Sequence, residues 1–130
     1  MASLFTRIVN KEIPCYKVFE DENYLAFLDI FPLVKGHTLL IPKIEIDDIF
    51  DIHDPIFSGL WQTSKMIASG IKKSFPCQKV GITVIGLEVP HAHIHLIPIH
   101  SMNDMNFANP KLQLSKKEFE EIAERIKNNL

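Results

Sequence analysis

The chain has 130 residues, of which 46 % are hydrophobic and 23 % charged, a balance typical of one folded domain rather than a disordered segment. A net charge of −2 with neutral histidines argues against a nucleic-acid backbone as the main partner, since proteins that bind one usually carry a strong basic excess. Cys15 and Cys77 lie far apart without a CxxC spacing, and neither a signal peptide nor a membrane-spanning run is visible, so we expect a cytoplasmic protein.

The first part of the chain predicts a short helix followed by three strands. The helix covers residues 3–10, where Leu4, Phe5 and Ile8 share one side. Alternating apolar residues indicate two strands, at residues 16–19 and 23–29, and residues 37–42 form a third.

The second part predicts a long helix, two strands and a last helix. Asp54 is expected to cap the long helix, with Pro55 at its first helical position, and Pro76 stops it. Ser115 and Glu118 form the pattern of a capping box, which begins the last helix, at about residues 115–129. The two strands between the helices cover residues 80–85 and 91–99.

The order of these elements is typical of an α+β domain with a mainly antiparallel sheet. The apolar stripes along the two longer helices indicate ordinary packing against that sheet. We expect one domain over residues 1–130.

Three of the six histidines, His91, His93 and His95, alternate with apolar residues. Side chains alternate across a strand, so these imidazoles should share one face and lie roughly 6–7 Å apart. Near pH 7 an imidazole can serve as nucleophile, acid, base or metal ligand. The pattern leaves open phosphoryl chemistry, a metal site completed by Glu88 or His37, and a polar face without chemistry.

Residues 91–97, His-Ala-His-Ile-His-Leu-Ile, resemble the signature of the histidine triad (HIT) family. Other segments are similar to the family in order and spacing, namely residues 4–14, 24–32 and 36–43. The likeness covers roughly residues 3–107 and is closest to the nucleotide-binding branch known as HINT. It implies the HIT-like fold, with an antiparallel sheet, a long central helix and short terminal helices, and a homodimer whose sheet continues across the interface.

The resemblance also implies an activity. Such a protein would be a nucleotide-binding hydrolase that cleaves a nucleoside 5′-phosphoramidate or a related nucleotidyl conjugate through a nucleotidyl-histidine intermediate. A purine would be preferred, and no metal or other cofactor would be needed. Three alternatives stay open: a nucleotide-binding regulatory protein with little turnover, a dinucleoside polyphosphate hydrolase, and a metal-dependent enzyme. We expect neither a nucleic acid nor a membrane as partner.

By resemblance, His93 is the nucleophile and His95 contacts the phosphate and helps the leaving group. His91 supports the nucleophile from beneath, and His37 lies near the phosphate. Asp29 falls on the carboxylate that binds the ribose hydroxyls, a sensible role because a carboxylate accepts two hydrogen bonds from a cis-diol. The walls of the base pocket fall on apolar residues, which are Leu4, Phe5, Ile8, Phe27, Leu28 and Ile30.

The segment before the triad, residues 83–90, departs from the family pattern. Family members usually carry an Asn and a Gly-rich loop that ends in Gln or Ser near the phosphate, whereas this segment is shorter and places Leu87 and Glu88 there. Glu88 either bends toward the leaving group, where it repels anionic substrates, or follows simple alternation onto the opposite face. Phe107, in a Met-Asn-Phe that resembles the family's Met-Asn-Trp, is expected near the active site of the partner subunit.

Many bacterial relatives also carry a zinc site, with a CxxC near the start and a His after the Pro-Lys. In this sequence Ser3, Thr6 and Glu45 stand at those places. Hydroxyl groups are poor zinc ligands beside thiolate and imidazole. We therefore expect this zinc site to be absent and no metal to be bound.

Overall fold

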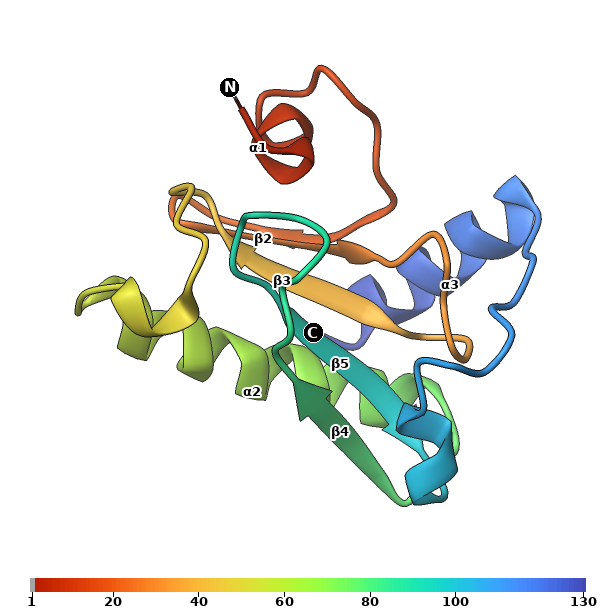
Figure 1. Cartoon of the computed structure of the whole chain (residues 1–130). Coiled ribbons are helices and arrows are strands. Elements are labelled where there is room, and N and C mark those ends of the chain that lie inside the picture. The colour runs from red at the N-terminus through yellow and green to blue at the C-terminus, as the bar shows by residue number, and fades with distance from the viewer. Residues whose placement is uncertain (1) are drawn as a thin grey trace.

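A computed structural model describes residues 2–130, so Met1, the first residue of the expected domain, lies outside the described part. The elements form a five-stranded sheet, antiparallel at every pairing, in the order β1-β2-β3-β5-β4 (Figure 1). Along the chain they are α1 (Leu4–Val9), β1 (Lys17–Glu20), β2 (Tyr24–Leu28), β3 (Thr38–Pro42), the 3₁₀ helix η1 (Ile49–Asp51), α2 (Ile56–Ser74), β4 (Lys79–Thr83), β5 (Ile94–Ile99), the 3₁₀ helix η2 (Met102–Met105) and α3 (Lys116–Asn128).

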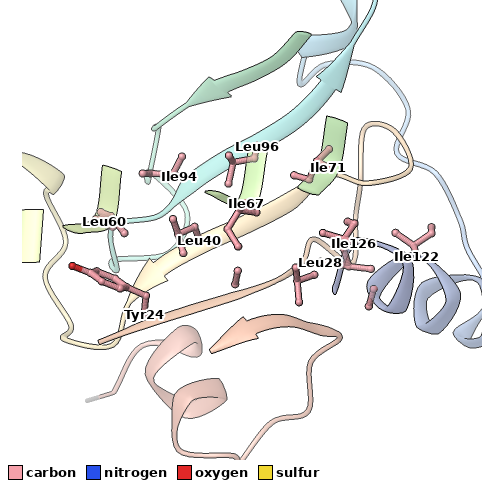
Figure 2. Close-up of a cluster of buried hydrophobic side chains, with 14 of the residues drawn as sticks. Tyr24, Leu28, Leu40, Leu60, Ile67, Ile71, Ile94, Leu96, Ile122 and Ile126 are labelled. Atoms are coloured by element: carbon pink, nitrogen blue, oxygen red, sulfur yellow. The ribbon is translucent and has the colours of Figure 1, made fainter. Parts of the chain in front are cut away.

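Different helices pack on the two faces of the sheet. The long helix α2 and the C-terminal α3 pack on one face, and α1 lies on the other (Figure 1). The main core fills the space between the sheet, α2 and α3 (Figure 2). A second, smaller apolar cluster lies under α1 and joins Phe5 to Leu25, Phe27, Leu39 and Ile41 of β2 and β3. Alternate residues of the same strands therefore serve both layers.

Truncating the main core should lower stability strongly. Leu60 of α2 is fully buried among the strands, so Leu60→Ala leaves a cavity as well as losing transfer free energy. We expect the free energy of unfolding to fall by about 2–5 kcal/mol. Urea denaturation measures the change, with Met66→Ala, a partly exposed position of the same helix, as the control. A loss at Leu60 no larger than that at Met66 would contradict this packing.

The expected α+β fold with an antiparallel sheet is confirmed, including the order of helices and strands. Ser115 and Glu118 do form a capping box at the start of α3, since each side chain bonds to the backbone N–H of the other. In the described part of the chain, no helix has both the length and the apolar character needed to cross a lipid bilayer.

Two expected boundaries are wrong. Pro55 is the N-cap of α2 rather than its first helical residue, and the Asp54 carboxylate caps by accepting from the Ser58 N–H at 2.9 Å. The triad strand begins at Ile94 and not at His91. The backbone before it is bonded elsewhere, because the Ala92 N–H donates to the Ile46 carbonyl at 2.7 Å instead of to β3.

Candidate functional site

A cavity of about 540 Å³ opens beside α1 on the sheet face that α1 covers. Apolar side chains make most of its wall, and a few polar groups converge on it, which is typical of a small-molecule site. Most residues singled out in the sequence line this cavity; they are Leu4, Phe5, Ile8, Phe27, Leu28, Asp29, Ile30, Glu88, His93, His95 and Phe107. His37 and His91 lie behind the wall, each about 1 % exposed or less.

The His93 ring is held by the backbone of its own segment. Its Nδ1 lies 2.8 Å from the His91 carbonyl oxygen, and a carbonyl only accepts, so Nδ1 carries the hydrogen. Nε2 therefore keeps a free lone pair in the neutral ring. The edge-on ring of Phe5, with its centroid 4.9 Å away, packs against this imidazole. In its neutral form, His93 thereby presents an unprotonated Nε2 to the cavity.

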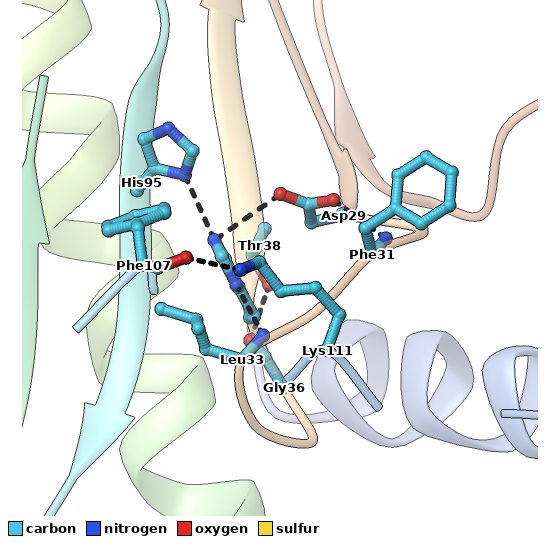
Figure 3. Close-up of polar contacts among 9 residues, drawn as sticks. Asp29, Phe31, Leu33, Gly36, Thr38, His95, Phe107 and Lys111 are labelled. Carbon is cyan, nitrogen blue, oxygen red and sulfur yellow. Dashed lines mark hydrogen bonds and ion pairs between the residues drawn. The ribbon is translucent and has the colours of Figure 1, made fainter. Parts of the chain in front are cut away.

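His37 and His95 form a chain of oriented hydrogen bonds (Figure 3). The Leu33 N–H donates to His37 Nδ1 at 3.1 Å, so the hydrogen of neutral His37 resides on Nε2. That Nε2 lies 2.9 Å from His95 Nδ1 and donates to it, which leaves the hydrogen of His95 on Nε2. His95 is thus held as a donor, the opposite tautomer to His93.

Burial keeps this pair of imidazoles neutral. Desolvation, with the neighbouring His95 second, lowers the pKa of His37 to about 3. Desolvation, followed by His93, lowers the pKa of His95 to about 4. Both rings are uncharged near pH 7, so the site can receive a phosphoryl anion without first breaking an internal ion pair.

The local fold puts His37 and Asp29 side by side. Asp29 follows the end of β2 and His37 precedes β3, and the Asp29 N–H donates to the His37 carbonyl at 3.1 Å. Gly36, at φ +98°, supplies the left-handed residue that the tight turn before His37 requires. The carboxylate lies 3.5 Å from His37 Nε2, and burial raises the pKa of Asp29 (Figure 3).

His91 differs from the other two triad imidazoles, because its ring does not line the cavity. Its Nε2 donates to the Pro42 carbonyl at 2.8 Å, and its Nδ1 faces the Ser3 hydroxyl at 2.9 Å. The ring is fully buried behind the cavity wall. The backbone carbonyl of His91 holds the His93 ring from behind, and the His91 imidazole takes part in a different cluster.

Two groups of side chains have ligand types or positions that suggest a metal ion. Ligand atoms of Asp29, His37 and His95 all lie within 4.8 Å of one another. A metal at His37 Nε2 would move the hydrogen to Nδ1, where it would oppose the Leu33 N–H. This group therefore does not fit a metal.

The second group is formed by Ser3, Thr6, Glu45 and His91. Here the two hydroxyls are poor zinc ligands and already bond within the cluster, so this group does not fit zinc either. We expect purified protein to contain less than stoichiometric zinc and to keep its activity in a chelator, as measured by elemental analysis beside an assay. One tightly bound zinc per chain, lost together with activity, would contradict this.

Phe107 lies at the site of its own chain. Its ring is 5.0 Å from the His95 ring and 6.1 Å from the His37 ring, and whether it also approaches a partner's site stays a prediction. The capping box of η2, between Ser101 and Asp104, turns the chain back along its own sheet.

Lys111 is a residue that the sequence reasoning missed. It lines the cavity, and its ammonium donates to the Phe107 carbonyl (Figure 3). The same ammonium also donates to the Asn109 carbonyl. No motif marks it, because its position depends on this return of the chain. Glu88 also lines the cavity, opposite to the face that simple alternation predicts.

Comparison with known proteins places these observations in a family. The model of the HIT domain matches residues 10–102. A HIT-like protein of Borreliella burgdorferi is 36 % identical over 135 residues, which cover 98 % of this chain and 97 % of that protein. The adenosine 5′-monophosphoramidase HNT1 of Saccharomyces cerevisiae is 35 % identical over 98 residues, 75 % of this chain and 62 % of that protein.

Solved structures agree on the fold. A Hit-like protein of Bartonella henselae superposes with a TM-score of 0.85 at 27 % identity, over 98 % of this chain and 96 % of that one. A zinc-bound histidine triad family protein of Mycobacterium smegmatis gives a TM-score of 0.81 at 27 % identity, over 99 % and 93 % of the two chains. With the triad motif, the fold and the match over most of its length, this chain belongs to the HIT family.

Proposed function

We propose that this protein hydrolyses a nucleoside 5′-phosphoramidate or a related nucleotidyl conjugate, with His93 as the nucleophile. The observation that carries the proposal is the opposite orientation of two neighbouring imidazoles, whose ring centroids lie 5.0 Å apart. His93 offers an unprotonated Nε2, and His95 offers an Nε2–H. A displacement at phosphorus needs this combination of a nucleophile and a donor. The similarity to two yeast adenosine 5′-monophosphoramidases supports the substrate class.

In the first step, His93 Nε2 attacks phosphorus and the bond from phosphorus to the amine nitrogen breaks. A phosphoryl anion beside His37 and His95 raises their pKa values, so the site takes up one proton with the substrate. As the amine leaves, its nitrogen receives this proton, and the Nε2–H of His95 donates toward that nitrogen. The product is a nucleotidyl-imidazolium on His93, whose positive Nδ1–H is stabilised by the His91 carbonyl.

In the second step, water attacks the same phosphorus and the bond from phosphorus to His93 Nε2 breaks. The proton of the attacking water passes to His95 and then leaves with the nucleoside monophosphate or to solvent, so both rings are neutral again when the product is released. The rest of the rate acceleration comes from binding the substrate and holding its phosphorus in position for attack. Asp29 is suited to the ribose hydroxyls, and the apolar wall of Phe5, Ile8 and Phe27 is suited to a base, for which we propose a purine.

The deciding experiment is a fluorogenic adenosine phosphoramidate assay set beside the affinity for adenosine monophosphate. We expect both turnover and binding, with a nucleotidyl-protein intermediate trapped by acid quench. Binding without turnover would favour a nucleotide-binding regulatory protein. Preferred cleavage of a dinucleoside polyphosphate would favour the other hydrolase class.

We also propose a homodimer. β4 is an edge strand of the sheet. Ile82 within β4 is 47 % exposed, and Ile85, two residues after its end, is 48 % exposed. An edge strand with exposed apolar residues is a natural pairing surface. Light scattering in solution tests this, and a monomer at micromolar concentration would contradict it.

Glu88 should act on the choice of leaving group. Glu88 lines the cavity, and its carboxylate contributes to the raised pKa of Asp29, so it adds negative charge to the site. We expect Glu88→Gln to raise kcat/KM about tenfold more for a substrate with an anionic leaving group than for a matched cationic one. Two substrates that differ only in this charge measure the ratio.

Glu12→Gln, a change of the same kind at an exposed residue outside the cavity wall, is the control for Glu88→Gln. It should leave the ratio unchanged. An unchanged ratio in Glu88→Gln itself would remove this carboxylate from the leaving-group side.

A further inference from the structure

A cluster of polar side chains behind the cavity joins three distant parts of the chain. Ser3 and Thr6 belong to the start of α1, Glu45 follows β3, and His91 begins the triad. The Glu45 carboxylate accepts from the Ser3 N–H and from the Thr6 hydroxyl, each at 2.6 Å. The Ser3 hydroxyl lies 2.9 Å from His91 Nδ1. We call these four residues the N-terminal cluster.

The direction of each hydrogen bond in the N-terminal cluster follows from its partners. His91 Nε2 must donate to the Pro42 carbonyl, so His91 Nδ1 accepts and the Ser3 hydroxyl donates. The Ser3 oxygen in turn accepts from the Thr6 N–H at 3.0 Å. The hydrogen bonds from Thr6 and then Ser3 lower the pKa of Glu45 to about 2. The cluster is therefore held by a charged carboxylate at any ordinary assay pH.

α1 needs an attachment of this kind. It has six residues, and so short a helix is not stable by itself. It lies on the opposite face of the sheet from α2 and α3 (Figure 1). Its one buried apolar side chain is Phe5, whose ring packs edge-on against Phe27 at 5.5 Å and His93 at 4.9 Å. Ile8 and Val9 are only partly buried against the apolar cluster that contains Phe5. The N-terminal cluster supplies the polar attachment at the helix start, where Ser3 is the N-cap.

The same helix carries one wall of the cavity, through Leu4, Phe5 and Ile8. The cluster also reaches the nucleophile, because the backbone carbonyl of His91 accepts from His93 Nδ1. One network thus relates the wall beside a bound base to the ring that attacks phosphorus. A shift of α1 would move that wall while leaving His95 and His37 in place, since these lie on β5 and beside β3.

We propose that the N-terminal cluster is a hydrogen-bonded clamp that holds α1 over the cavity, and that Glu45 acts through it as a positioning residue for the nucleoside part of the substrate. The last clause rests on the proposed function, whereas the clamp itself does not. In this protein, hydrogen bonds among two hydroxyls, a carboxylate and an imidazole hold α1 in place. A zinc ion could hold the helix at the same position only if thiolates or further imidazoles replaced the hydroxyls.

Hydrogen exchange of α1 tests the clamp without any substrate. In Glu45→Ala, the α1 amides should exchange about tenfold faster while the amides of β5 stay unchanged, because a hydrogen bond to a charged group is lost at one place only. Glu45→Gln keeps one acceptor oxygen, so its α1 amides should exchange at a rate between those of the wild type and Glu45→Ala. Asp47→Ala, which removes an exposed carboxylate from the same loop, is the matched control. Unchanged α1 exchange in Glu45→Ala would overturn the clamp.

A pair of substrates tests the positioning role. On an adenosine phosphoramidate, Glu45→Ala should lose about tenfold in kcat/KM, through KM. On a ribose 5′-phosphoramidate with the same amine and no base, it should match the wild type. Equal losses on both substrates would overturn the role. If the wild type turns over neither substrate, the proposed function fails, and the affinity for adenosine monophosphate replaces KM as the measurement.

A metal can replace the hydrogen bonds if the proposal is right. In the triple variant Ser3→Cys/Thr6→Cys/Glu45→His, two thiolates and an imidazole surround the free lone pair of His91 Nδ1, a set that suits tetrahedral zinc. We expect slow α1 exchange with Zn²⁺ alone and fast exchange with chelator. Slow exchange in both conditions would show that α1 is held without this cluster and would overturn the proposal.

Discussion

Replacing His93 with alanine is expected to abolish turnover while leaving nucleotide binding within a few-fold of the wild type. The variant loses the only imidazole of the site that is held with an unprotonated Nε2 at the cavity wall. Loss of a covalent nucleophile should cost more than the ~10²–10⁴-fold typical of a general acid or base. Steady-state hydrolysis of an adenosine phosphoramidate and calorimetric binding of adenosine monophosphate measure the two effects.

The controls for His93 separate chemistry from packing. His93→Asn keeps an N–H group that can donate to the His91 carbonyl, so it should be as inactive as His93→Ala while preserving the local structure. Acid quench followed by mass spectrometry should find the nucleotidyl adduct in the wild type and in neither variant. Hydrolysis by His93→Ala at a rate near that of the wild type would refute the assignment of the nucleophile.

Replacing His95 with asparagine is expected to lower kcat by roughly 10²–10⁴-fold on a substrate with an alkylamine leaving group. The amine needs a proton as it leaves, and His95 is held by His37 with its Nε2–H free. A nitrophenolate leaves without a proton, so the matched nitrophenyl ester of the same nucleotide should lose far less. The ratio of the two losses, measured with saturating substrate, is the expected signature.

An exposed histidine controls for the change of residue. His53→Asn alters a histidine before α2 that lies outside the cavity wall, and both substrates should react as in the wild type. Equal losses on the amine and on the nitrophenyl ester in His95→Asn would show that His95 positions the phosphoryl group and directs no proton.

Local patterns were sufficient where a short segment decides its own structure. The apolar period of α2, the capping box of α3 and the short apolar runs of β2 and β3 depend on neighbours within a few residues, so the α+β fold followed from them. The ends of the helices and strands were predicted less well. Pro55 caps α2 instead of entering it, and β5 starts three residues late because the backbone before it bonds to the loop at Ile46.

The sequence by itself determined the fold class, the triad motif and the identity of most residues around the cavity. Only the tertiary structure decided which ring nitrogen of each histidine is free, because the Leu33 N–H and the carbonyls of Pro42 and His91 set the tautomers. It also brought Lys111 and Phe107 to the site and joined Ser3 to Glu45 across 42 residues. These partners are far apart in the chain or belong to its backbone, and neither kind leaves a periodic signal that a side-chain pattern can record.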